Sequence, residues 1–146
     1  MIDGRRNQKE LYFELSCYTL AHPGPQFIHQ HAVDAYAAQT AGESTKPITL
    51  VFALVGLYLM VEKGFSGRDV QRAHMRLAQK RKQWPRLELP ENRGRINVAD
   101  VIAEPPGEAR DRALRRWCAS VWEAFSLDRQ AVIELVENES IVASRG

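Results

Sequence analysis

Apolar positions recur at helical spacing along most of the chain. Between Lys9 and Ala21 they repeat every three or four residues, until prolines and a glycine at 23–25 interrupt the pattern. Pro25 suits the first turn of a second helix, and Gly42 is expected to end that helix. The pattern therefore predicts two helices in the first third of the chain.

The most apolar stretch is a run of 14 residues that begins at Ile48 and ends at Val61. It is apolar on every side of a helix, so other elements must surround it, and it is too long for a buried strand. A membrane span needs roughly 20 apolar residues, so the run predicts a central core helix and no contact with a membrane. Its short link to the preceding helix predicts that the two lie antiparallel.

The pattern continues to be helical beyond this run. Ser66 and Asp69 resemble a capping box that starts a fourth helix, which should end before Trp84. Residues 85–97 are rich in prolines and scattered charge, and they predict an ordered loop packed over the bundle. Residues 98–103 predict one or two helical turns.

The last third carries a dense apolar stripe at i, i+3 and i+4 spacing, which indicates a surface helix: Leu114, Trp117, Cys118, Val121, Trp122 and Phe125. A final helix is expected over 128–138. The fold class predicted is all-α, a compact bundle of five to six helices around the central apolar helix. Residues 1–146 are expected to form one domain, with flexible ends at 1–8 and 139–146.

Composition agrees with one globular domain. The chain has 146 residues, of which 45% are apolar and 26% charged, and its net charge of +2 identifies no partner. The polar N-terminus lacks the apolar core of a secretory signal, so a cytoplasmic location is expected. Cys17 and Cys118 lie in apolar surroundings without a CxxC spacing, which predicts two buried thiols.

Candidate chemistry is concentrated in residues 27–39. This segment puts polar side chains into an otherwise apolar helix, where burial is costly unless they are paired or bound. On a helix His31 and Asp34 face the same way, while His29 and Tyr36 form a neighbouring strip. His74, on the fourth predicted helix, is expected to point inward.

One hypothesis is a metal or ligand site between the second and fourth helices. A metal needs three or four ligands from facing positions; the candidates are His31, Asp34 and His74, with His22 or His29 as a fourth. Imidazoles would suit zinc, iron or nickel, which could activate water for hydrolysis or a thiol for transfer. Tyr36 and Gln39 are the candidates for contacting a small-molecule ligand.

The alternative hypothesis is a structural hydrogen-bond network. His31 and Asp34 would then bond each other, and Tyr36 and Gln39 would bond to nearby backbone. The protein would be a non-catalytic interaction protein, for example a homodimer.

A basic stripe recurs every four residues on the fourth predicted helix: Arg68, Arg72, Arg76 and Lys80. Such a stripe could meet phosphates. However, there is no recognition-helix pattern and no overall excess of charge, so a solvated helix face is favoured and a nucleic-acid partner is not expected.

The segment Phe27-Ile28-His29-Gln30-His31-x-Val33-Asp34-Ala35-Tyr36-x-x-Gln39 resembles a family of small helical bacterial proteins of unknown function. The resemblance implies no activity. Many relatives carry N-terminal cysteines that would suit a metal, and this chain lacks them. The predicted architecture is loosely similar to DinB-like four-helix metal proteins. Those proteins use a His-x-x-x-His pair that this chain lacks, so His22, His31 and His74 would have to converge in another way.

Overall fold

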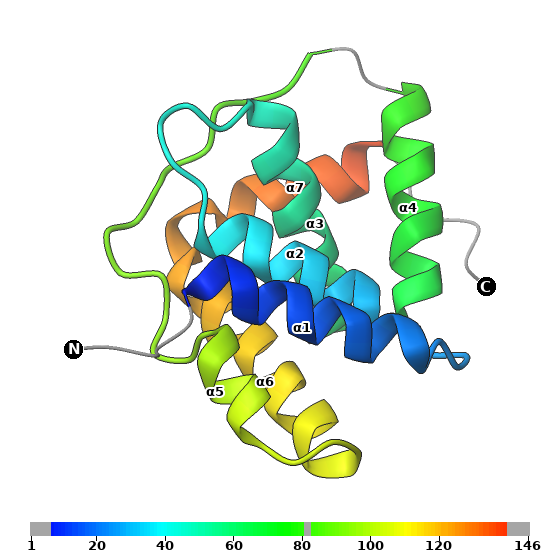
Figure 1. Ribbon diagram of the computed structural model, residues 1–146. Helices are drawn as coiled ribbons and strands as arrows, with labels where there is room; N and C mark the ends of the chain where they lie inside the picture. The colour runs from blue at the N-terminus through cyan, green and yellow to red at the C-terminus, as the bar shows by residue number, and fades with distance from the viewer. Residues whose placement is uncertain (1–6, 81–82, 140–146) are drawn as a thin grey trace.

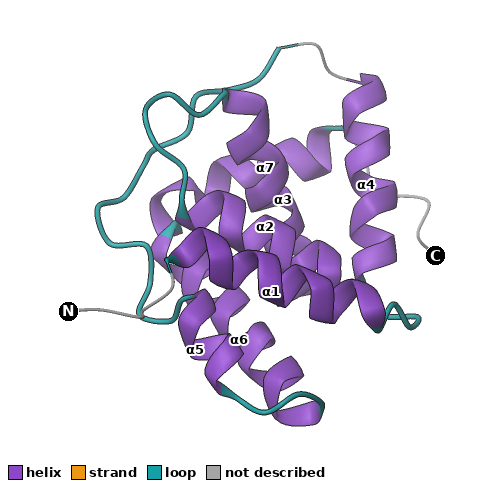
Figure 2. Ribbon diagram, in the orientation of Figure 1, coloured by secondary structure: helices purple, strands orange, loops and turns teal. Residues whose placement is uncertain are grey.

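The computed structural model describes residues 7–80 and 83–139, and within them every regular element is a helix (Figures 1 and 2). The elements in chain order are α1 (Gln8–Ala21), α2 (His29–Gln39), α3 (Pro47–Lys63), α4 (Gly67–Lys80), α5 (Val98–Ala103), α6 (Glu108–Ala124), the 3₁₀ turn η1 (Ser126–Asp128) and α7 (Arg129–Asn138). The predicted all-α class is confirmed. Seven α-helices occur in these residues where five to six were expected.

Helix α3 is the centre of the fold, as its apolar sequence predicted. It packs against α2, α4, α6 and α7, and its middle turns are fully buried. Pro47 occupies the first turn, where its missing N–H costs nothing, and Gly64 ends the helix in the left-handed conformation with φ 72°. The apolar side chains of α3 are thus covered by the four helices that surround it.

Helix α2 is shorter than its sequence predicted. It begins at His29 and not at Pro25, and it has 11 residues. The preceding residues form a turn in which Phe27 has a φ of 45°. The backbone N–H of Gly67, at the start of α4, donates to the Gln26 carbonyl at 2.6 Å. The start of α4 therefore holds this turn in a conformation that a helix could not adopt.

The predicted ordered loop is confirmed: it leads to α5 along one side of the bundle (Figure 1). Trp84, Leu87, Leu89 and Ile96 are partly buried against the core. Asn97 caps α5 in a complete capping box with Asp100. The short segment after the loop therefore forms a defined helix and not a loose turn.

Two further expectations concern the thiols and the chain ends. Cys118 is buried as predicted, but Cys17 is exposed, because it lies on the outer face of α1. The ends expected to be flexible lie outside the described residues, except for Asn7, Gln8 and Glu139. Asn7 caps α1. Within the described ranges, no helix combines the length and the apolarity that a membrane crossing requires.

Candidate functional site

A cavity of about 350 Å³ lies between α2, α3 and α4, and we call it the Asp34 pocket. Its size is at the lower end of the range for small-molecule sites. Most of its wall is apolar, and four polar side chains contribute to it. The lining residues are Gln30, Val33, Asp34 and Ala37 from α2, Ile48, Thr49, Phe52 and Ala53 from α3, and His74 from α4.

Asp34 is buried, with 3% of its surface exposed. Its Oδ1 accepts a hydrogen bond from Gln30 Nε2 at 3.1 Å, whereas its Oδ2 has no partner among the described residues. Burial raises the pKa of this carboxyl well above its usual range, and the bond from Gln30 opposes that rise. Asp34 is thus a buried acid without a compensating cation in the part of the chain that the structure describes.

Gly56 of α3 makes room for this carboxyl. A Cβ atom on Gly56 would lie 1.9 Å from Asp34 Oδ2, so no other residue fits there without a shift of the two helices. The carboxyl group therefore packs directly against the backbone of the central helix. A glycine within an apolar helical run is a sequence signal for such a close approach.

His74 enters the pocket with a defined tautomer. Its Nε2 lies 2.8 Å from the Phe52 carbonyl oxygen, and its ring stacks on the Phe52 ring with centroids 4.9 Å apart. Because a carbonyl only accepts, Nε2 carries the hydrogen and Nδ1 keeps a lone pair. Burial lowers the pKa of His74, and the Phe52 carbonyl partly offsets this. His74 is therefore a neutral imidazole with one free acceptor nitrogen.

His31 does not line this pocket, although it lies only three residues before Asp34. It is buried against α6, where Cys118 Sγ donates to its backbone carbonyl at 3.6 Å. Burial, together with the nearby Arg115 cation, lowers the pKa of His31 to about 4. The expected bond between His31 and Asp34 is wrong: within the described residues both His31 Nδ1 and Asp34 Oδ2 lack partners, because the two side chains turn to different helices.

The two other histidines are held elsewhere. His29 Nδ1 lies 2.8 Å from the Thr19 hydroxyl of α1, and His22 Nδ1 lies 2.7 Å from the Tyr18 carbonyl at the end of α1. Of the five side chains predicted as metal ligands, only Asp34 and His74 share a pocket. Residues 7–80 and 83–139 contain no group of three or more His, Cys, Asp or Glu side chains arranged to hold a metal ion.

Tyr36 and Gln39, the predicted ligand contacts, also lie outside the pocket lining. Tyr36 stacks on Tyr12 of α1, with ring centroids 3.9 Å apart and 3° between the planes. The Gln39 amide donates to the carbonyls of Arg93 and Ile96 at 3.2 and 2.8 Å, and it accepts from Trp117 Nε1 at 2.9 Å. Gln39 thus joins α2 to the loop and to α6.

Gln30, Gly56 and Thr49 are among the residues of the site that were not singled out from the sequence. Gln30 lies four positions before Asp34, a spacing at which side chains meet on a helix. Gly56 carries the signal of a glycine inside a core helix. Thr49 follows Pro47 in the first turn of α3, and nothing in its local pattern indicates a cavity.

Fold and site together define a small all-α protein with a mostly apolar pocket beside its central helix. The chain matches the family of unknown function DUF5946 over residues 9–126, and it belongs to that family. The match includes α2, α3 and α4, and hence the whole Asp34 pocket. Comparison with curated proteins and with solved structures gave no match.

Proposed function

We propose that this protein binds a small organic molecule in the Asp34 pocket, and that the molecule carries a protonated nitrogen or several N–H groups. The observation that supports the proposal most directly is the buried Asp34 carboxyl, which has one oxygen without a partner and no compensating cation within residues 7–80 and 83–139. Unpaired buried polar atoms are rare and call for a partner. Because Oδ2 lies against the α3 backbone at Gly56, a ligand in the pocket would pair with the carboxyl after a rotation of that group brings an oxygen to the pocket side.

The chemistry of the lining favours a donor as ligand. An ionised Asp34 only accepts, and the free Nδ1 of neutral His74 also accepts. A ligand ammonium or amidinium would hydrogen-bond to these acceptors, while its carbon skeleton would contact Val33, Ala37 and Ile48. Because desolvation raises the pKa of Asp34, a cation that pairs with the carboxyl would displace its proton.

A divalent metal ion is less well supported in the same pocket. Only Asp34 and His74 among its lining residues are common metal ligands, whereas structural and catalytic zinc sites use at least three protein ligands. Binding of zinc or nickel in this pocket is the outcome that competes with binding of an organic cation.

The test is a fragment screen of the full chain by ¹H–¹⁵N NMR, with primary amines and amidines set against neutral molecules of the same shape. Amines are expected to shift the amides of α2, α3 and α4, and Asp34→Asn is expected to weaken binding at least about tenfold, the loss typical of one charge-assisted hydrogen bond. Asp128→Asn is the matched control, because Asp128 is also buried with an unpaired Oδ2 but lies outside the pocket.

Three results would contradict the proposal. Amines and their neutral analogues could bind equally well, Asp128→Asn could weaken binding as much as Asp34→Asn, or the shifts could map outside the pocket. Zinc or nickel binding at one equivalent that is lost in His74→Phe would support the metal hypothesis instead.

A second candidate function, self-association, is favoured by the outer face of α1. Phe13 and Leu20 lie on the same face, seven residues apart, and are 70% and 52% exposed. Phe13 lies in a shallow groove on this face that Lys9, Glu10 and Cys17 also line, so a second copy of α1 could cover the apolar side chain. Light scattering should then report a dimer that Phe13→Glu converts to a monomer; a monomer at all concentrations would exclude this function.

A further inference from the structure

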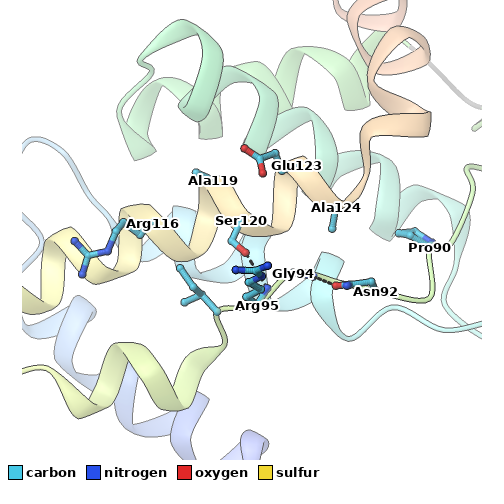
Figure 3. Close-up of a pocket in the computed structure, with 10 residues that line it drawn as sticks. Pro90, Asn92, Gly94, Arg95, Arg116, Ala119, Ser120, Glu123 and Ala124 are labelled. Atoms are coloured by element: carbon cyan, nitrogen blue, oxygen red, sulfur yellow. Dashed lines mark hydrogen bonds between the residues drawn. The ribbon is translucent and has the colours of Figure 1, made fainter.

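A second groove, with a larger volume of about 740 Å³, lies between the loop at residues 90–96 and α6 (Figure 3). We call it the α6 groove. It is independent of the Asp34 pocket, with which it shares no lining residue. Arg116, Ser120 and Glu123 follow one another along α6, and Asn92, Gly94 and Arg95 lie across from them on the loop (Figure 3).

The loop is fixed against α6 at the middle of the groove. The Arg95 backbone N–H donates to Ser120 Oγ at 3.1 Å, and the Gly94 N–H donates to Asn92 Oδ1 at 2.8 Å. Gly94 has a φ of 101°, and a Cβ atom there would lie 2.7 Å from Ser120 Oγ. A glycine is required at this contact both for its conformation and for its small size. The groove is therefore held in shape before any ligand arrives.

The polar groups of the groove are mostly hydrogen-bond donors. Ser120 Oγ already accepts from Arg95, so its hydroxyl hydrogen is available to a ligand. Asn92 uses its oxygen for Gly94, which leaves its amide hydrogens. The exposed guanidinium groups of Arg95 and Arg116 form no hydrogen bond or ion pair with any described residue.

A set of donors that includes two arginines with no partner among the described residues favours an oxyanion. Guanidinium groups bind phosphate through two parallel hydrogen bonds, and they are the usual residues at such sites. Glu123 adds one acceptor, one helical turn beyond Ser120. A ligand complementary to both ends of the groove has an anionic group near Arg95, and the rest of the molecule has a hydroxyl or amino donor near Glu123.

We infer that the α6 groove binds a small phosphate monoester, with the phosphate between Arg95 and Ser120 and the body of the molecule directed along α6. Arg116 lies one helical turn from Ser120 on the same face, and its long exposed side chain can reach the same phosphate by rotation. Sugar phosphates and nucleoside monophosphates share this chemistry.

The test is an NMR titration of the full chain at low ionic strength with ribose 5-phosphate, AMP and inorganic phosphate, and with ribose and adenosine as uncharged controls. The two esters distinguish a sugar phosphate from a nucleotide. The proposal predicts that at least one ester shifts the amides of 92–96 and 116–124 with a Kd below about 1 mM, a value equivalent to roughly 4 kcal/mol. Ribose and adenosine should cause no such shifts.

Two variants address the phosphate contacts. Arg95→Gln and Arg116→Gln each remove one exposed cation and are expected to weaken ester binding about tenfold or more, as for a lost charge-assisted contact. Arg112→Gln is the matched control, because Arg112 also lies on α6 but pairs with Glu108 outside the groove. It should leave the affinity unchanged.

The proposal fails if neither ester shifts these amides at about 10 mM, well above the millimolar range of a weak specific site. It also fails if Arg112→Gln weakens binding as much as Arg95→Gln, which would indicate general attraction to positive charge. Equal affinity for inorganic phosphate and for both esters would show an anion site that does not contact the rest of the molecule, and would overturn the assignment of an ester.

Discussion

Two polar residues of α2, Gln39 and Asp34, differ in whether their side-chain polar atoms have hydrogen-bond partners. Gln39, at the end of the helix, has all its polar atoms engaged by the loop and by Trp117. Asp34, little more than one turn earlier, is more deeply buried than the half-buried Gln39, yet one of its oxygens has no partner among the described residues. The role of Gln39 is structural, because its hydrogen bonds to the loop and to Trp117 offset the cost of burying its amide. Asp34 leaves a cost that a ligand can remove, so unpaired burial identifies the candidate site better than burial alone.

The largest effect is expected where Asp34 packs against α3. Gly56→Ala should destabilise the fold by about 3 kcal/mol, the range for an overpacked core contact, because the new methyl group would overlap with Asp34 Oδ2. Urea denaturation measures the change. In Asp34→Ala the same Gly56→Ala substitution should cost much less, and a strictly additive double mutant would show that the two residues do not interact.

His31 should make stability depend on pH. Its folded pKa of about 4 lies below the ordinary value of 6.5, so the folded state binds fewer protons than the unfolded state between these values. Its contribution is complete above pH 6.5 and is lost as pH falls toward 4, by about 3 kcal/mol in all. His31→Gln should flatten this part of the curve of unfolding free energy against pH. An unchanged slope in the variant would contradict the assignment.

Substitution of Gln39 tests whether its hydrogen bonds to the loop and to α6 stabilise the fold. Gln39→Ala leaves the Trp117 indole N–H and the Ile96 carbonyl without their partner, which should cost about 2 kcal/mol in thermal or chemical unfolding. Thr40→Ala is the control: the Thr40 hydroxyl is exposed and bonds only to the Tyr36 carbonyl, so a loss of about 0.5 kcal/mol or less is expected. Similar losses in the two variants would remove the structural role given to Gln39.

Asp34→Asn should have an effect on stability whose sign depends on pH. The raised pKa of Asp34 means that the protonated acid favours the folded state, and that this contribution is lost as pH rises through the folded pKa. The neutral amide keeps an oxygen for Gln30 and never ionises. The variant should therefore gain stability relative to the parent as pH rises from 5 to 9. Equal differences at both pH values would show that Asp34 is not perturbed.

Much of the fold follows from the pattern of apolar positions, because core helices must match their apolar faces to neighbours. The central helix is predicted on that basis, the cap at Ser66 from a capping-box spacing, and the loop over the bundle from its prolines and scattered charge, and all three are confirmed. The start of α2 differs from its prediction, because the turn before it accepts a hydrogen bond from Gly67, more than 35 residues later in the chain. Local preference favoured a helix from Pro25, and a distant backbone contact overrode it.

The candidate site was predictable only in part. Helical spacing predicts that His31 and Asp34 face the same way on α2, but it does not say which helix each side chain meets. Asp34 turns to Gly56 of α3 and His31 turns to α6, so the pair does not form one cluster. His74 is expected to point inward, and its side chain lines the same pocket as Asp34. The cavity itself depends on packing between helices, which periodicity cannot specify.

The most direct test of the Asp34 pocket is calorimetric titration with the best amine from the fragment screen, in two buffers of equal pH and different ionisation enthalpy. If the ligand cation pairs with Asp34, the carboxyl releases its proton on binding, so the observed heats differ between the buffers and the affinity rises with pH. Asp34→Asn should abolish both the proton release and most of the affinity. Binding to Asp34→Asn with unchanged affinity, or identical heats in both buffers across pH 5–9, would contradict the account.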